Sequence, residues 1–129
     1  MAAPNIVNIS TLTGKTTYVN LTTTGSTSIL SNASGSGRVY KINSLFVSNT
    51  DTTNVVNFTA NYYDSSSITA ATSSGSLAGS ITVPAKSNLI ILDKSTALYL
   101  EENKSIGAIA GTATKLTVIC SYEDIGYWE

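Results

Sequence analysis

Residues 38–63, RVYKINSLFVSNTDTTNVVNFTANYY, decide the fold class of this chain. Apolar side chains alternate with polar ones over 38–49 and again over 56–62, which is the period of a half-buried β-strand. The parity of the alternation changes within the first run, because Tyr40 and Ile42 share one parity whereas Leu45 and Val47 share the other. An extra residue re-aims every later side chain, so the pattern predicts a β-bulge near Asn43 or Ser44.

The rest of the chain carries similar short runs, separated by clusters of Gly, Ser, Asn and Asp, and no amphipathic helical stretch of useful length. The polar segment 49–54 predicts a hairpin loop that joins the two strands described above. The apolar run 89–92 predicts a strand covered on both faces, or an aggregation-prone segment kept short by Asp93 and Lys94. Further strands are expected at 15–22, 28–30, 81–83, 98–100, 105–110 and 116–122.

These segments predict one all-β domain over 1–129, a two-layer β-sandwich of jelly-roll or immunoglobulin-like type with about eight or nine strands and negligible helix. A short extended N-terminal arm, 1–5, and an aromatic C-terminal tail, 125–129, are expected to flank it. Cys120 shares a strand face with Leu116 and Val118, which predicts a buried thiol rather than a nucleophile.

The composition argues against several functional classes. Histidine is absent and cysteine occurs once, which disfavours acid–base catalysis near neutral pH, internal disulfides and thiolate zinc sites. Charged residues make up 12% and the net charge is -1, so neither nucleic acid nor an anionic membrane is an expected partner. The opening residues lack the basic cluster and apolar run of a signal peptide. The sequence therefore predicts a non-enzymatic protein made in the cytoplasm, with no cofactor and no metal.

Two patterns that look chemical have plainer structural explanations. Gly14-Lys15-Thr16 resembles the end of a phosphate-binding loop, but Ile9 stands where the first glycine belongs and a β pattern follows. The adjacent carboxylates at 101–102 and at 123–124 would point to opposite faces of a strand and could not act together. Two distant carboxylates could still meet in the fold as a catalytic or calcium site, Asp51 and Asp64.

The two chain ends are the candidate interfaces. The arm 2–5 has too few apolar groups to fold alone, and Pro4 holds it extended. The single tryptophan lies one residue from the end of the chain, where it either folds back onto the domain or anchors another protein. The residues predicted to contact a partner are Ala2, Ala3, Pro4, Asn5, Ile125, Tyr127 and Trp128.

Five segments carry a resemblance to a known class of protein: MAAPNIVN at 1–8, VYKINSL at 39–45, ITVPA at 81–85, ALYLEE at 97–102 and LTVICSYE at 116–123. Together they resemble small virion structural proteins of marine tailed phages, particularly cyanophages. The resemblance spans most of the chain and implies no catalytic residue.

The resemblance implies a non-enzymatic virion protein, preferably a capsid decoration or cement protein that binds the assembled shell. The major capsid protein is then the expected partner, and the chain is expected to form a small homo-oligomer. A neck or tail component is the rival position in the virion. A glycan-binding adhesin is the alternative from another class, since seven tyrosines and loops rich in Ser, Thr and Asn suit sugar stacking and hydrogen bonding.

Overall fold

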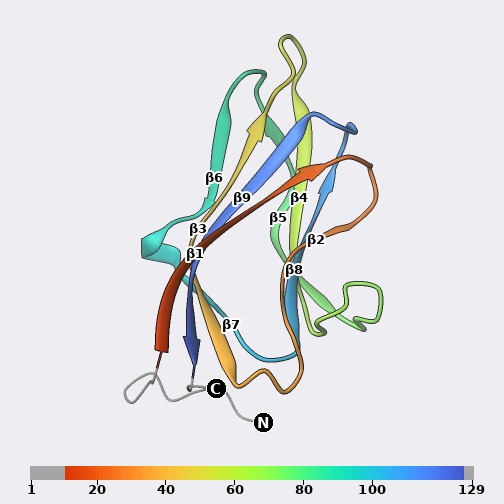
Figure 1. Ribbon diagram of the computed structural model, residues 1–129. Helices are drawn as coiled ribbons and strands as arrows, with labels where there is room; N and C mark the ends of the chain where they lie inside the picture. The colour runs from red at the N-terminus through yellow and green to blue at the C-terminus, as the bar shows by residue number, and fades with distance from the viewer. Residues whose placement is uncertain (1–10, 127–129) are drawn as a thin grey trace.

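The computed structural model describes residues 11–126, which form two antiparallel β-sheets packed face to face (Figure 1). The first sheet contains, in order, β1 (Thr11–Leu21), β9 (Leu116–Gly126), β3 (Arg38–Asn49) and β6 (Asn88–Leu92), with the short β7 (Leu98–Leu100) also paired to β3. The second sheet contains, in order, β2 (Thr27–Asn32), β8 (Lys104–Ala110), β4 (Val56–Tyr63) and β5 (Ser74–Val83). One 3-10 turn, η1 (Lys94–Thr96), completes the described elements.

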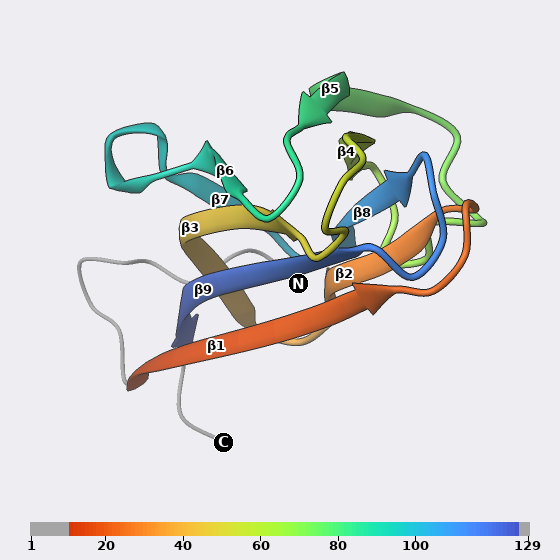
Figure 2. The ribbon, with the colours of Figure 1, turned by 90° about the horizontal axis from the view of Figure 1, so that it is seen from above.

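The strand order distinguishes between the two predicted kinds of sandwich. The first four described strands alternate between the sheets, and the first described strand, β1, pairs with the last, β9 (Figures 1 and 2). This arrangement is that of a jelly roll and not that of an immunoglobulin domain, in which the first two strands share a sheet. The predicted all-β sandwich is confirmed. Within residues 11–126 no helix has the length and apolar character of a membrane-spanning segment.

The predicted bulge in β3 is confirmed. Ile42 pairs with Tyr122, and Ser44 pairs with Ser121. Two consecutive residues of β9 are therefore matched by three residues of β3, and Asn43 is the extra one. This insertion allows Ile42 and Leu45 both to face the core although they are three residues apart, and both are almost fully buried.

The predicted hairpin at 49–54 is wrong. β3 belongs to the first sheet and β4 to the second, so the segment between them crosses the end of the sandwich (Figure 2). A strand with one apolar face satisfies its pattern equally well beside its neighbour or across the core from it, and the alternation therefore does not specify pairing.

The prediction that 89–92 is covered on both faces is also wrong. β6 lies at an edge of the first sheet, and the side chain of Ile90 is 63% exposed. The short length expected in the alternative is confirmed, because β6 ends at Leu92: the Asp93 carboxylate accepts a hydrogen bond from the Ser95 amide and begins η1 directly after the strand.

The core lies between the two sheets and is apolar. Its largest fully buried side chains come from both layers and include Phe58 and Ile106 on one side and Leu45 and Val118 on the other. Cys120 is fully buried among them, as predicted.

Two buried asparagines tie the sheets together near opposite ends of β3. Asn32 on β2 donates from Nδ2 to the carbonyl oxygens of Arg38 and Leu100 in the other sheet, both at 2.9 Å. Asn49 on β3 donates to the carbonyl oxygens of Asn54 and Val83, both at 3.0 Å. The sandwich is therefore closed near each end by an amide that bridges its layers.

Candidate functional site

Ile125 is the one predicted interface residue within the described part of the chain; the other six, Ala2, Ala3, Pro4, Asn5, Tyr127 and Trp128, lie outside it. Ile125 is a residue of β9, paired with Leu12 on β1 and Val39 on β3, and is 5% exposed. The expected tail 125–129 therefore begins too early, because regular strand pairing continues to Gly126.

The structure separates the two carboxylates that could have formed a joint site. Asp51 precedes β4 and Asp64 follows it, so they lie at opposite ends of that strand. Each is engaged in its own loop: backbone amides of Thr53 and Asn54 donate to Asp51, while Thr72 and Ser73 donate to Asp64. These hydrogen bonds lower the pKa of both carboxyl groups. Among residues 11–126, no three His, Cys, Asp or Glu side chains are grouped to hold a metal ion.

Gly14-Lys15-Thr16 lies within β1, and its lysine belongs to a cluster of charges. Lys15 Nζ lies 3.0 Å from one oxygen of Asp124, and Arg38 NH1 lies 2.9 Å from the other. The Asp124 side chain is only 4% exposed, so it meets two cations in a nearly dry position. The cluster joins β1, β9 and β3 at the lower end of the sheet.

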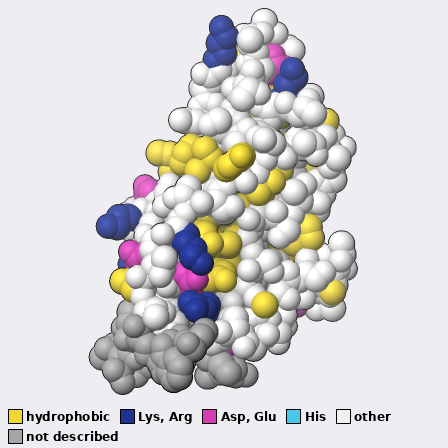
Figure 3. Space-filling view, in the orientation of Figure 1, with side chains coloured by type: hydrophobic (Ala, Val, Ile, Leu, Met, Phe, Trp, Pro, Cys, Tyr) yellow, Lys and Arg dark blue, Asp and Glu magenta, His cyan; other side chains and the backbone are white. Residues whose placement is uncertain are grey.

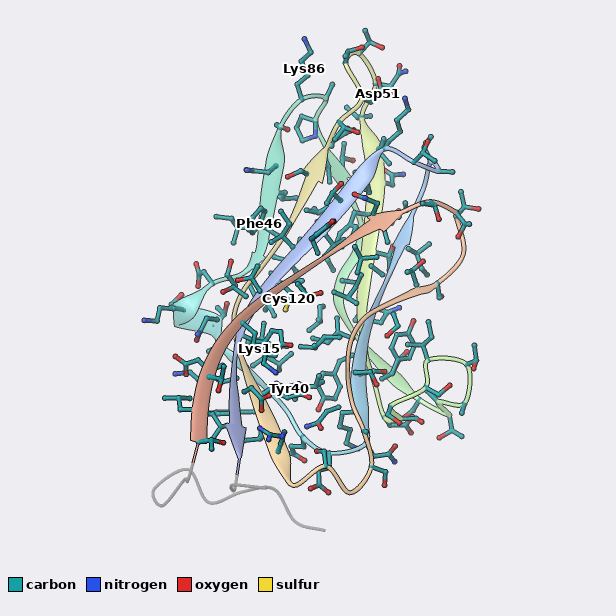
Figure 4. The ribbon with its side chains drawn as sticks, viewed as in Figure 1. Lys15, Tyr40, Phe46, Asp51, Lys86 and Cys120 are labelled. Carbon is teal, nitrogen blue, oxygen red and sulfur yellow. The ribbon has the colours of Figure 1, made fainter. Side chains whose placement is uncertain are left out.

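Two tyrosines line the cluster on the face that β9 turns to the core. The rings of Tyr40 and Tyr122 are 5.1 Å apart and tilted by 49°, and Figure 4 shows Lys15 and Tyr40 near one another in the lower half of the molecule. Burial raises the pKa of both phenols, and the hydrogen bond to Asp124 raises the pKa of Lys15. Each group is thus held in its ordinary protonated form, which suits a structural clamp rather than a base or a nucleophile.

A second feature occupies the opposite, outward face of the first sheet. We call it the apolar row: Tyr18 pairs with Ile119, Ile119 with Phe46, and Phe46 with Ile90, so four large side chains follow one another across β1, β9, β3 and β6. Tyr18 is 68% exposed and Ile90 is 63% exposed. The space-filling view shows a band of apolar side chains at this height, where Figure 4 labels Phe46 (Figures 3 and 4).

Uncharged polar side chains border the apolar row above and below. On one side the paired residues are Asn20, Thr117, Ser48 and Asn88, and on the other they are Thr16, Ser121 and Ser44. Cross-strand hydrogen bonds join some of them, for example Thr117 Oγ1 to Asn20 Oδ1 at 2.7 Å. The result is a surface with an apolar centre and hydrogen-bonding borders, and none of these eleven positions carries a charge.

Sequence reasoning missed the apolar row although the chain contains a signal for it. Phe46 stands between Leu45 and Val47, and Ile119 between Val118 and Cys120, so each is an apolar residue at a position that alternation assigns to solvent. An apolar residue of outward parity in the middle of a strand indicates a second covered face or an interaction surface. That both residues lie in one row depends on the strand order, which the sequence did not specify.

Cys120 does not contribute a reactive group. Burial raises the pKa of its thiol to about 12, so the thiolate is scarce at neutral pH.

Comparison with known proteins places the chain in no family: no family model matches it, and no curated protein matches it. One similar solved structure carries the description "Bacillus endospore appendages form a novel family of disulfide-linked pili". The two chains are 12% identical, the match covers 92% of this chain and 90% of that one, and the TM-score is 0.49. We draw no functional conclusion from a likeness of this degree.

Proposed function

We propose that this chain is a non-enzymatic structural protein of a virion, a capsid decoration protein that binds the assembled shell through the outward face of its first sheet. The observation that carries the proposal is the apolar row with its uncharged borders. Exposed apolar patches rimmed by polar residues are typical of protein–protein interaction sites, and large side chains left exposed on every copy favour association.

The chemistry of this face favours a protein partner over nucleic acid. Its four apolar side chains follow one another across four strands, and the bordering Ser, Thr and Asn side chains can pair with a partner's backbone. None of the residues in these three rows is a lysine or arginine, and these residues supply most of the affinity of proteins for the nucleic-acid backbone. The position on the capsid rests on the resemblance of the sequence to phage virion proteins.

The test compares two exposed aliphatic residues in purified particles. Ile90 is in the apolar row and 63% exposed, whereas Val55 is 57% exposed in the segment between β3 and β4. Burying an isoleucine side chain stabilises an interface by about 1.5 to 3 kcal/mol, so Ile90→Ser should weaken binding to shells by roughly tenfold or more. Val55→Ser should bind as the parent does, and both variants should keep its melting temperature.

The composition of purified particles is the second test. A decoration protein should appear in purified particles in proportion to the shell protein, whereas a neck or tail component should appear in few copies. Equal retention of Ile90→Ser and Val55→Ser on particles would show that the outward face does not bind the shell, and absence of the chain from particles would refute the virion role.

A glycan-binding adhesin remains the second candidate, because two tyrosines on this same face, Tyr18 and Tyr99, are well exposed. Their rings could stack on sugars while neighbouring Asn20 supplies hydrogen bonds. Glycan-array binding that is lost in Tyr18→Ala and kept in Ile90→Ser would favour this candidate over shell binding.

A further inference from the structure

β1 differs from every other edge strand among the described residues. β2 and β5 each contain register shifts against their neighbours, and β6 has five residues and a shift against β3. β1 pairs with β9 over eleven consecutive residues without a shift. No strand of residues 11–126 pairs with its other edge, which is visible at the border of the sheet in Figure 2.

This edge also lacks most of the devices that protect natural sheet edges, which are bulges, short length, prolines and charges. The five residues Leu12 to Thr16 are all exposed, and the strand contains no proline. The one such device it carries is a single charged residue, Lys15, whose side chain is 48% exposed and pairs with Asp124 on the core-facing side of the sheet. A long and regular edge to which no described strand pairs is a template on which another strand can pair through its backbone.

We propose that β1 pairs with β1 of a second copy of this chain, antiparallel, around a two-fold axis that passes midway between the two copies of Thr16. In this register Thr11 lies opposite the partner's Leu21 and every one of the eleven residues is paired. The even-numbered residues of β1 lie on the outward face in both copies. The outward faces of the two first sheets therefore form one continuous surface across the β1–β1 pair.

The side chains of β1 fit this register. Tyr18, which is 68% exposed, lies opposite the partner's Gly14, and nothing stands within 4 Å of the position that a Cβ on Gly14 would occupy. An aromatic ring packed over a cross-strand glycine is a favourable pair, and the two-fold axis creates it twice. Lys15 lies opposite the partner's Thr17, so no like charges face each other directly.

The inference deepens the proposed function, because it names the contact between copies of the shell-binding protein. Only the link to shell binding rests on the proposed function. Pairing through β1 leaves the outward face open and places two apolar rows on one continuous sheet. A pair of copies would therefore offer a shell two linked sites, which strengthens attachment through effective concentration.

Cysteine cross-linking of the full-length purified protein tests the register. Residues directly opposite in an antiparallel pair have Cα atoms about 4.5 to 5.5 Å apart, which a disulfide can span. Thr16→Cys should therefore form a covalent dimer under mild oxidation. Tyr18→Cys should not, since the two thiols would be displaced by four residues, about 13 Å along the strand.

Ser121→Cys is the matched control, because Ser121 neighbours Thr16 on the same face but belongs to β9. Its two copies would be three strand spacings apart, about 14 Å, and should not cross-link. Cross-linking of Ser121→Cys as fast as Thr16→Cys would indicate face-to-face stacking and overturn the proposal. So would cross-linking of Tyr18→Cys in place of Thr16→Cys. The native Cys120 is fully buried and does not interfere.

A second measurement does not depend on a new thiol. Thr16→Lys places two lysines opposite each other at the axis, which should raise the dimer dissociation constant in sedimentation experiments about fivefold, whereas Ser121→Lys should leave it unchanged. A parent protein that sediments as a monomer at all concentrations, together with no cross-link in Thr16→Cys, would refute the pairing. Neither experiment involves particles, so its failure is distinct from failure of the shell-binding test.

Discussion

Asn32→Ala should be among the most destabilising single substitutions in this domain. The Asn32 side chain is fully buried and makes three hydrogen bonds: it donates to the carbonyls of Arg38 and Leu100 and accepts from the Ser36 hydroxyl at 2.6 Å. Truncation removes both donors and leaves two carbonyl oxygens without them between the sheets. Each buried polar group left unpaired costs about 1 to 3 kcal/mol, so the expected loss is about 2 to 6 kcal/mol.

That loss is large beside the total of about 5 to 15 kcal/mol that holds a domain of ordinary stability together. Urea unfolding followed by circular dichroism would measure it as a lower midpoint at unchanged slope. Asn20→Ala is the matched control, because Asn20 is an exposed asparagine of β1 that accepts one hydrogen bond, from Thr117. Its loss should stay within about 0.5 kcal/mol, as is usual for surface substitutions.

An Asn32→Ala variant that loses less than about 1 kcal/mol, no more than Asn20→Ala does, would refute this account of the bridging amide. It would mean that the two carbonyls find other donors or water once the amide is gone. Asn49→Ala should cost a similar amount, and the two losses should add, because the residues lie near opposite ends of β3 and share no hydrogen-bond partner.

Three further outcomes follow from the described contacts. Hydrogen bonds lower the folded-state pKa of Asp64 below its ordinary value of 3.8. The stability that they provide should therefore be present above about pH 4 and lost as the pH falls through the folded pKa. Asp64→Asn should reduce this acid dependence in urea unfolding measured from pH 7 to pH 2. Native Cys120, whose thiol has a pKa of about 12, should react with a bulky thiol reagent at pH 8 far more slowly than in denaturant, and equal rates would contradict its burial. Deletion of 125–129 should lower the melting temperature more than deletion of 127–129, because only the larger deletion removes residues of β9 that pair with β1 and β3; equal melting temperatures would show that these pairs contribute little.

Much of the fold could be predicted because β-strands carry their pattern locally. The change of parity between Ile42 and Leu45 was enough to predict a bulge near Asn43 or Ser44, and the shared face of Leu116, Val118 and Cys120 was enough to predict a buried thiol. Each of these depends on the direction of side chains along one strand, which sequence spacing determines.

Strand pairing and the surface sites could not be predicted in the same way. The apolar faces of β3 and β4 fit either a hairpin or two facing sheets, and the choice depends on the whole topology. Asp124 pairs with Lys15 and Arg38, which are each more than 80 residues away in the sequence. The local sequence does not show which of the adjacent carboxylates, Glu123 or Asp124, forms these ion pairs. The apolar row is likewise a product of strand order.

The place of β9 between β1 and β3 has a consequence for the order of synthesis. Ribosomes make β1 and β3 early, but β9, which separates them, is the last of the described strands to emerge. Until then the two early strands face a vacant slot that is one strand wide, with every backbone group along it still unpaired. A β9 from a neighbouring copy has the same sequence and can pair in the same register, so we expect crowded translation to raise the fraction of chains that exchange this strand.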